Sequence, residues 1–174
     1  TRIYNSIIEN NVIPPMGPSG LQNTQPLGIK VYGGEIVLVD VDIKNNIHET
    51  DSPHGVASLL LSGSPSAILK NVKIVNNNFL NGNNGGIYTE CFSSCGDLFL
   101  SNVTIAKNSG NGFLWSNSYS AYHLTIINSI LWSDDGAPTI GPYSGSRTSV
   151  YYSNIKGFTT TENAGMGFNL NWDV

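Results

Sequence analysis

Histidine and carboxylate side chains gather in one short segment of the sequence. His48, Glu49, Asp51 and His54 lie between positions 48 and 54. Side chains of these types can bind a cation or transfer protons. Their spacing matches no established metal motif, so an ordinary surface loop is the favoured interpretation. His48 and His54 nevertheless stand as candidate catalytic residues.

A second candidate pairs an acid with a base. Asp42 and Lys73 hold equivalent positions in two neighbouring repeats, which are defined below. A lysine beside a carboxylate could serve as the base of a polysaccharide lyase, with Ca²⁺ held by the acid. The simpler interpretation is a cross-strand ion pair, and the same interpretation applies to Glu9 beside Lys44.

A third candidate is the adjacent pair Asp134 and Asp135. Glycoside hydrolysis needs two carboxylates on one face. These two follow a predicted strand inside a loop rich in glycine and proline, where aspartate is a favoured turn residue. Turn formation is therefore the favoured interpretation, and hydrolysis stays as the alternative.

Aromatic residues gather toward the C-terminal half and could stack on a sugar ring or pack against a partner protein. The predicted ligand-binding residues are Trp115, Tyr119, Tyr122, Trp132 and Tyr151. Trp132 and Tyr151 both fall at outward positions of predicted strands. The alternative is that the 134–146 loop or the C-terminal tail folds over these rings.

A recurring six-residue phrase positions these side chains. It begins at Asn5, Asp40, Asn71, Asn102, Asn128 and Tyr152, with spacings of 35, 31, 31, 26 and 24 residues. Its fourth position is Ile8, Ile43, Ile74, Ile105, Leu131 and Ile155. The alternation of apolar and polar residues continues upstream of each phrase. A period of two predicts a strand on each side of a polar corner, with the fourth-position residues buried in one column.

The first position of the phrase has a structural explanation. A corner between two strands requires a backbone conformation that asparagine tolerates better than other non-glycine residues. Asn5, Asp40, Asn71, Asn102 and Asn128 are therefore predicted to form a ladder. In this prediction each side chain bonds the corner backbone of the next repeat, satisfying buried polar groups.

Repeats of short strands without helical segments are predicted to stack as a solenoid. The recurring Asn-Val-x-Ile phrases, the isoleucine column and the stretch Asn83-Asn84-Gly85-Gly86-Ile87-Tyr88 resemble the right-handed parallel β-helix proteins. These include the pectin lyase-like superfamily and bacterial surface β-helix repeat proteins. The resemblance covers residues 1–157 and implies an all-β solenoid of about six coils. Such a family includes polysaccharide lyases, hydrolases, adhesins and fibre proteins, so the fold assigns no activity.

The remaining segments are predicted to be loops inserted between the repeats and a C-terminal segment. Loops are expected at 13–26, 47–55 and 134–146, and an irregular cap or the start of a further coil at 158–174. The chain begins at Thr1 without methionine or a signal peptide, so a processed form or a fragment is expected.

Composition limits the classes of function. The 174 residues include eight Lys and Arg and twelve Asp and Glu. This acidic balance predicts no basic surface for binding nucleic acid. No apolar run reaches the length of a transmembrane span. Cys91 and Cys95 have no histidine or further cysteine nearby to complete a zinc site, so they form either a small disulfide loop or two free thiols.

The sequence therefore predicts a non-catalytic extracellular or cell-surface module with a structural or adhesive role and a surface for glycan. No cofactor is expected, and Ca²⁺ enters only with the lyase alternative. A lyase or glycoside hydrolase is the first alternative. The second is a filament subunit that binds another copy, or another segment of a β-helix, at its ends.

Overall fold

The computed structural model describes residues 1–14, 27–49, 57–63, 65–79, 85–91, 96–109, 114–118, 123–132 and 147–156. Within these ranges the regular elements are all strands, and every strand pair is parallel. The described part of the chain is therefore all-β, as predicted. No helix in these ranges is long and apolar enough to cross a membrane.

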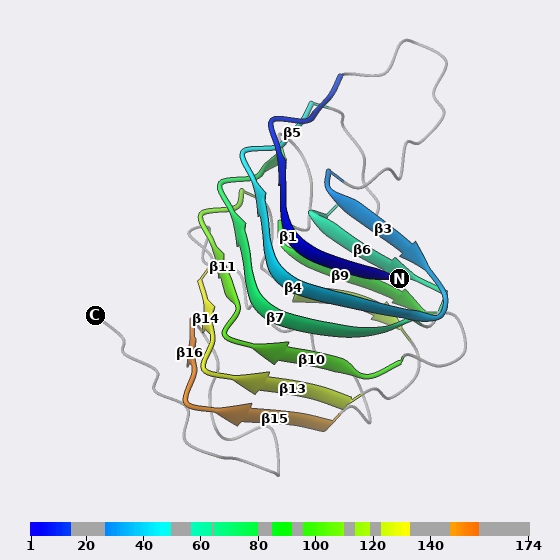
Figure 1. Ribbon diagram of the computed structural model, residues 1–174, viewed down its shortest axis with the longest axis vertical. Coiled ribbons are helices and arrows are strands. Elements are labelled where there is room, and N and C mark those ends of the chain that lie inside the picture. The colour runs from blue at the N-terminus through cyan, green and yellow to red at the C-terminus, as the bar shows by residue number, and fades with distance from the viewer. Residues whose placement is uncertain are drawn as a thin grey trace.

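The largest sheet has nine strands and curls around one side of the molecule (Figure 1). Its strands are β1 (Arg2–Glu9), β4 (Glu35–Lys44), β7 (Ser66–Val75), β10 (Leu98–Ser101), β11 (Thr104–Ala106), β13 (His123–Ile127), β14 (Ile130–Leu131), β15 (Arg147–Tyr151) and β16 (Asn154–Ile155). In β1, β4 and β7 one strand continues through the corner. In the later repeats the corner separates two strands, such as β10 and β11.

Two smaller sheets complete the described structure. The four-stranded sheet contains β3 (Ile29–Tyr32), β6 (Leu59–Ser62), β9 (Ile87–Cys91) and β12 (Leu114–Ser118). The three-stranded sheet contains β2 (Val12–Ile13), β5 (Ile47–His48) and β8 (Asn78–Phe79). The sequence pattern missed these sheets. Strands of two residues are too short to show alternation, and in β6 all four residues are buried. Two segments predicted as loops, 13–26 and 47–55, consequently begin with strand residues.

The aligned phrases pair in the predicted register. Ile43 lies opposite Ile8 on one side and Ile74 on the other, and the column continues through Ile105, Leu131 and Ile155. From Ile43 onward these side chains are fully buried. A second inward column runs through Ile3, Leu38, Leu69, Leu100, Ile126 and Val150. Equivalent residues of successive repeats therefore stack on one another.

One core joins the large sheet to the four-stranded sheet. Leu59, Leu61 and Ile87 of the smaller sheet pack with the two inward columns. A separate small cluster of Leu27 and Phe79, with Ile13 packed against it, lies at the three-stranded sheet. Parallel strands that repeat around a shared core are compatible with a β-helix or solenoid.

Candidate functional site

The corner residues adopt a left-handed backbone conformation. The φ angle is 47° at Asn5, 56° at Asp40, 53° at Asn71, 54° at Asn102, 49° at Asn128 and 50° at Tyr152. Asparagine and aspartate tolerate this region better than other non-glycine residues. Their recurrence at the first position of the phrase therefore has a backbone cause.

The side chains of these corners bond differently from the prediction. Asn71 donates from Nδ2 to Oδ1 of Asp40 at 2.9 Å, and Asn102 donates to Oδ1 of Asn71 at 3.1 Å. Both bonds join side chains and are exposed. The predicted bonds to buried corner backbone are thus replaced by a solvent-facing ladder, because the corner turns these side chains outward.

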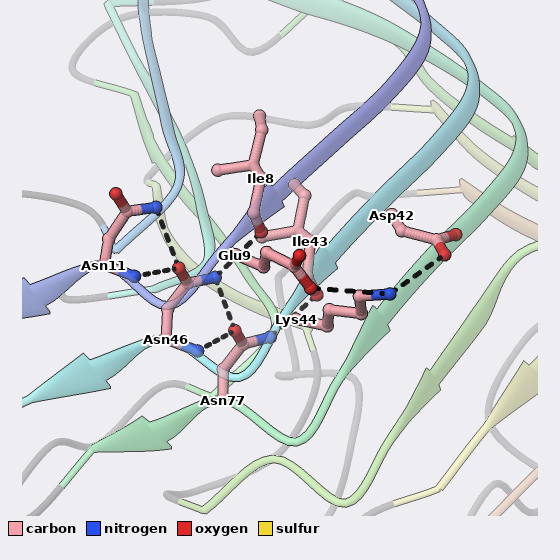
Figure 2. A network of polar contacts seen from close by, with 8 residues as sticks. All are labelled: Ile8, Glu9, Asn11, Asp42, Ile43, Lys44, Asn46 and Asn77. Atoms are coloured by element: carbon pink, nitrogen blue, oxygen red, sulfur yellow. Dashed lines mark hydrogen bonds and ion pairs between the residues drawn. The ribbon is translucent and has the colours of Figure 1, made fainter.

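A different asparagine column forms the buried ladder (Figure 2). Its buried members are Asn46, Asn77 and Asn108, and the exposed Asn11 lies at its end. Oδ1 of Asn77 accepts from the backbone amide of Asn46 at 3.1 Å and from its Nδ2 at 2.9 Å. Nδ2 of Asn77 also donates to the carbonyl of Ile43 at 3.0 Å. Asn46 and Asn77 therefore each tie their own repeat to both neighbouring repeats.

The signal for this ladder was present in the sequence. The residue directly after each of the first four phrases is asparagine, at positions 11, 46, 77 and 108. The alignment of phrases ended one residue too early to include it. Asn46 and Asn77 are almost completely buried, and buried amides of this kind require partners.

In the last two repeats, a serine at the second position of the phrase makes the buried bonds between repeats. Ser129 accepts the amide of Val103 at 3.1 Å, and Ser153 accepts the amide of Ser129 at 3.1 Å. Each serine hydroxyl also donates to the carbonyl two residues before it, at 2.8 Å. Among the described residues, these buried serines and asparagines thus join one repeat to the next.

The charged candidates lie on the outward side of the strands after the corner. Lys44 approaches Glu9 at 3.5 Å and Asp42 at 4.0 Å (Figure 2). Lys73 lies opposite Asp42 in the ladder, but the ion pair of Asp42 is made with Lys44 on its own strand. The predicted pairing of Glu9 with Lys44 is present, whereas Asp42 and Lys73 only share a register.

His48, a candidate catalytic residue, is buried at the three-stranded sheet. Its side chain is 2% exposed, and its ring stacks on Phe79 with centroids 6.4 Å apart. The two rings belong to adjacent strands of the three-stranded sheet. Within the described residues, no group of three or more histidine, cysteine or acidic side chains is placed to hold a metal ion.

Two of the predicted ligand-binding aromatics are described with their side chains. Trp132 lies beneath the ammonium group of Lys156, which is 5.4 Å from the ring centroid. Tyr151 is 37% exposed in β15. Trp132 follows the corner and Tyr151 precedes one, so they lie on different sides of the bend in the large sheet. A single aromatic row therefore does not connect them.

Several other predicted residues lie outside the described part of the chain. These are His54, Asp134, Asp135, Tyr119, Tyr122 and Cys95. Trp115 and Cys91 are described only as backbone positions, in β12 and β9.

The outward side of the large sheet before the corner forms a surface of its own, which we call the outward face. One of its rows contains Arg2, Val37, Ile68, Phe99, Thr125 and Ser149, and the next contains Tyr4, Val39, Lys70, Ser101, Ile127 and Tyr151. Burial alternates along the part of β4 before the corner and along β13, which sets these rows opposite the core. Tyr4 is 49% exposed. The face is thus a broad, mainly apolar and aromatic surface with two cationic side chains.

Comparison with known proteins yielded no matching family model, no matching curated protein and no matching solved structure.

Proposed function

We propose that the chain is a right-handed parallel β-helix of about six coils that acts as a non-catalytic module of an extracellular or cell-surface protein. Its role is structural or adhesive, and it contacts glycan through the outward face. The fold part of the proposal is supported by parallel pairing between repeats and by inward columns that extend through six phrases.

The outward face is the observation on which the functional part rests. Stacked coils place Val37, Ile68 and Phe99 in one row, with Tyr4 and Tyr151 at the two ends of the next. A soluble monomer rarely exposes a large contiguous apolar surface unless that surface binds something. Aromatic rings beside polar groups suit the alternating apolar faces and hydroxyls of a sugar.

The residues that could do chemistry support a structural role. The buried asparagines and serines satisfy one another between coils, and Asp42 and Glu9 both approach Lys44. These groups stabilise the stack in the positions where they lie. The proposal therefore assigns binding to the outward face and cohesion to the ladders.

Binding to a panel of neutral and acidic polysaccharides, measured by co-sedimentation and calorimetry, tests the proposal. We expect Phe99→Ala and Tyr151→Ala each to weaken binding by about fivefold or more. Tyr32→Ala is the matched control, because Tyr32 is 78% exposed but belongs to the four-stranded sheet. Absence of binding across the panel, or an equal loss in the control, would contradict the proposal.

The lyase alternative has one observation in its favour, namely the register that places Lys73 opposite Asp42. Its test is depolymerisation of the same polysaccharides with and without Ca²⁺. Turnover that disappears in Lys73→Ala would replace the non-catalytic proposal with a lyase.

A further inference from the structure

The upstream margin of the outward face carries acidic side chains. Its central strands β4, β7, β10 and β13 belong to one sheet (Figure 1). Glu35 begins β4 and points outward, because the next residue is buried, and Asp97 has the same relation to β10. Both acidic residues are exposed. Asp97 lies 3.6 Å from Nδ1 of His123 in the same row, and a histidine carries charge only when it is protonated.

The downstream margin of these strands carries a cation. Lys70 is the last residue of β7 before the corner, and its neighbours in the row are the uncharged Val39 and Ser101. The lysine is exposed and forms no ion pair with the described residues. The two margins of the face therefore carry charges of opposite sign.

An apolar row lies between the two margins. Val37, Ile68 and Phe99 are neighbours in this row, and Thr125 continues it. All four side chains are half-buried by their neighbours in the sheet, and their remaining surface faces away from the core. A sheet with such a face can pack against a second sheet about 10 Å away.

We propose that the outward face packs against the outward face of a second copy of the chain, around a two-fold axis that passes between β7 and β10. This axis, perpendicular to the sheet, exchanges the two margins and exchanges β7 with β10. It therefore sets Lys70 opposite Asp97 of the second copy, and symmetry forms the same ion pair twice. Packing with parallel strands would instead oppose the two acidic margins, which is unfavourable.

The uncharged side chains match around the same axis. Ile68 lies opposite Phe99 of the second copy, so the two apolar side chains at the centre cover one another. Ser66 lies opposite Ser101, which places small polar residues between the apolar row and the ion pairs. Four strands of five residues cover about 19 by 17 Å. A contact of this size is small for a permanent interface, so we expect a weak, reversible dimer.

The dimer does not depend on the proposed glycan binding, but it uses the same face. A glycan that occupies the outward face should therefore dissociate the dimer. Dimer formation without glycan binding would contradict only the proposed function. Glycan binding by a chain that stays monomeric would contradict only the inference of a dimer.

Sedimentation velocity from micromolar to millimolar concentrations tests the proposal, at a mildly alkaline pH that keeps histidine neutral and with reductant present. We expect a monomer–dimer equilibrium that added salt weakens. Lys70→Glu and Asp97→Lys each oppose like charges twice, so each should raise the dissociation constant more than about tenfold. The chain with both substitutions restores both pairs and should dimerise within about threefold of the unmodified chain.

Lys73→Glu is the matched control for these charge reversals. Lys73 is also an exposed lysine of β7, but it follows the corner and lies outside the outward face. Its reversal should leave the dimer unchanged. A monomer at every concentration would overturn the proposal. So would a doubly substituted chain that has the circular dichroism of the unmodified chain and remains monomeric.

Carbodiimide cross-linking of the unmodified chain provides a test without substitutions. Ser101, the neighbour of Lys70 in its row, lies four residues after Asp97. The lysine and the aspartate of one chain are thus about 13 Å apart along the strands, too far for a direct amide bond. We expect mass spectrometry to find this amide in cross-linked dimers and not in monomers. Dimers without it would overturn the proposed contact.

Discussion

Asn77 illustrates how one residue can join three successive repeats. Its Oδ1 accepts from Asn46, its Nδ2 donates back to the carbonyl of Ile43, and its amides bond forward to Asn108 at 2.9 and 3.0 Å. The corner residue Asn71 lies at the surface and makes single bonds to its neighbours. The two asparagines therefore stabilise the fold by different means, one by hydrogen bonding and the other by backbone conformation.

Replacing these two asparagines should separate the two effects. Asn77→Ala leaves the buried backbone amide of Asn46 without its acceptor and removes the bond to the carbonyl of Ile43, and we expect a loss of about 2 to 4 kcal/mol in the free energy of unfolding. Asn71→Ala should cost about 1 to 2 kcal/mol, chiefly because alanine disfavours a positive φ. Asn71→Gly, which tolerates this φ, should recover most of that loss. Urea titrations measure all three, and equal losses in Asn77→Ala and Asn71→Gly would contradict the assignment.

A charged substitution in the inward column should have a larger effect on stability than either asparagine substitution. Ile74 is fully buried, and a carboxylate there would have no partner, at a cost of several kcal/mol. Ile74→Asp or Ile105→Asp should therefore prevent folding, as judged by circular dichroism and thermal melting. Thr104→Asp is the control, because Thr104 is adjacent in sequence to Ile105 but points outward. Unchanged melting of Ile74→Asp would show that the register of the core is wrong.

At the scale of elements, predictability followed the length of each strand. β4 and β7 have ten residues each and show a clear alternation, so their existence, register and inward side could be predicted. β5 and β8 have two residues each, and no periodicity can be detected over two positions. The corner ladder was predicted at five positions with bonds to backbone, whereas the corner bonds described here join the side chains of Asp40, Asn71 and Asn102. A repeat alignment does not show which way a corner side chain turns.

Gly28 lies where the chain before β3 packs closely against Ser58 and Ile43. A Cβ atom on Gly28 would lie 2.7 Å from the carbonyl oxygen of Ser58 and 2.8 Å from Cγ2 of Ile43. Gly28→Ala should therefore destabilise the protein by about 1 to 3 kcal/mol, because the four-stranded sheet must move away from the core. Gly34 has a φ of 72° and open space around it, so Gly34→Asn should change stability by less than about 0.5 kcal/mol. The difference between the two melting temperatures is the measurement.

At the scale of the whole molecule, stability should vary along the stack. The described contacts between strands join neighbouring coils, so each coil depends on the coils beside it. β7 has β4 on one side and β10 and β11 on the other, whereas β1 pairs only with β4 among the described strands. Position in the stack should therefore decide local stability.

Hydrogen exchange of the dilute protein should follow this order. We expect amides of β7 to be the slowest and amides of β1 to exchange faster, because opening an end coil breaks contacts on one side only. Peptide-level mass spectrometry distinguishes the two strands. Uniform protection from β1 to β7 would indicate a single cooperative unit in place of a stack of coupled coils.

The parallel ladders also set the mechanical response of the molecule. The hydrogen bonds between coils lie roughly along the stacking direction, because each strand bonds to its counterpart in the next coil. Tension between the two ends of the stack would load one inter-coil junction after another, and the coil with the fewest bonds would detach first. Tension across the stack would instead be shared by the covalent backbone of every coil. The molecule is therefore expected to resist lateral pulling more strongly than axial pulling.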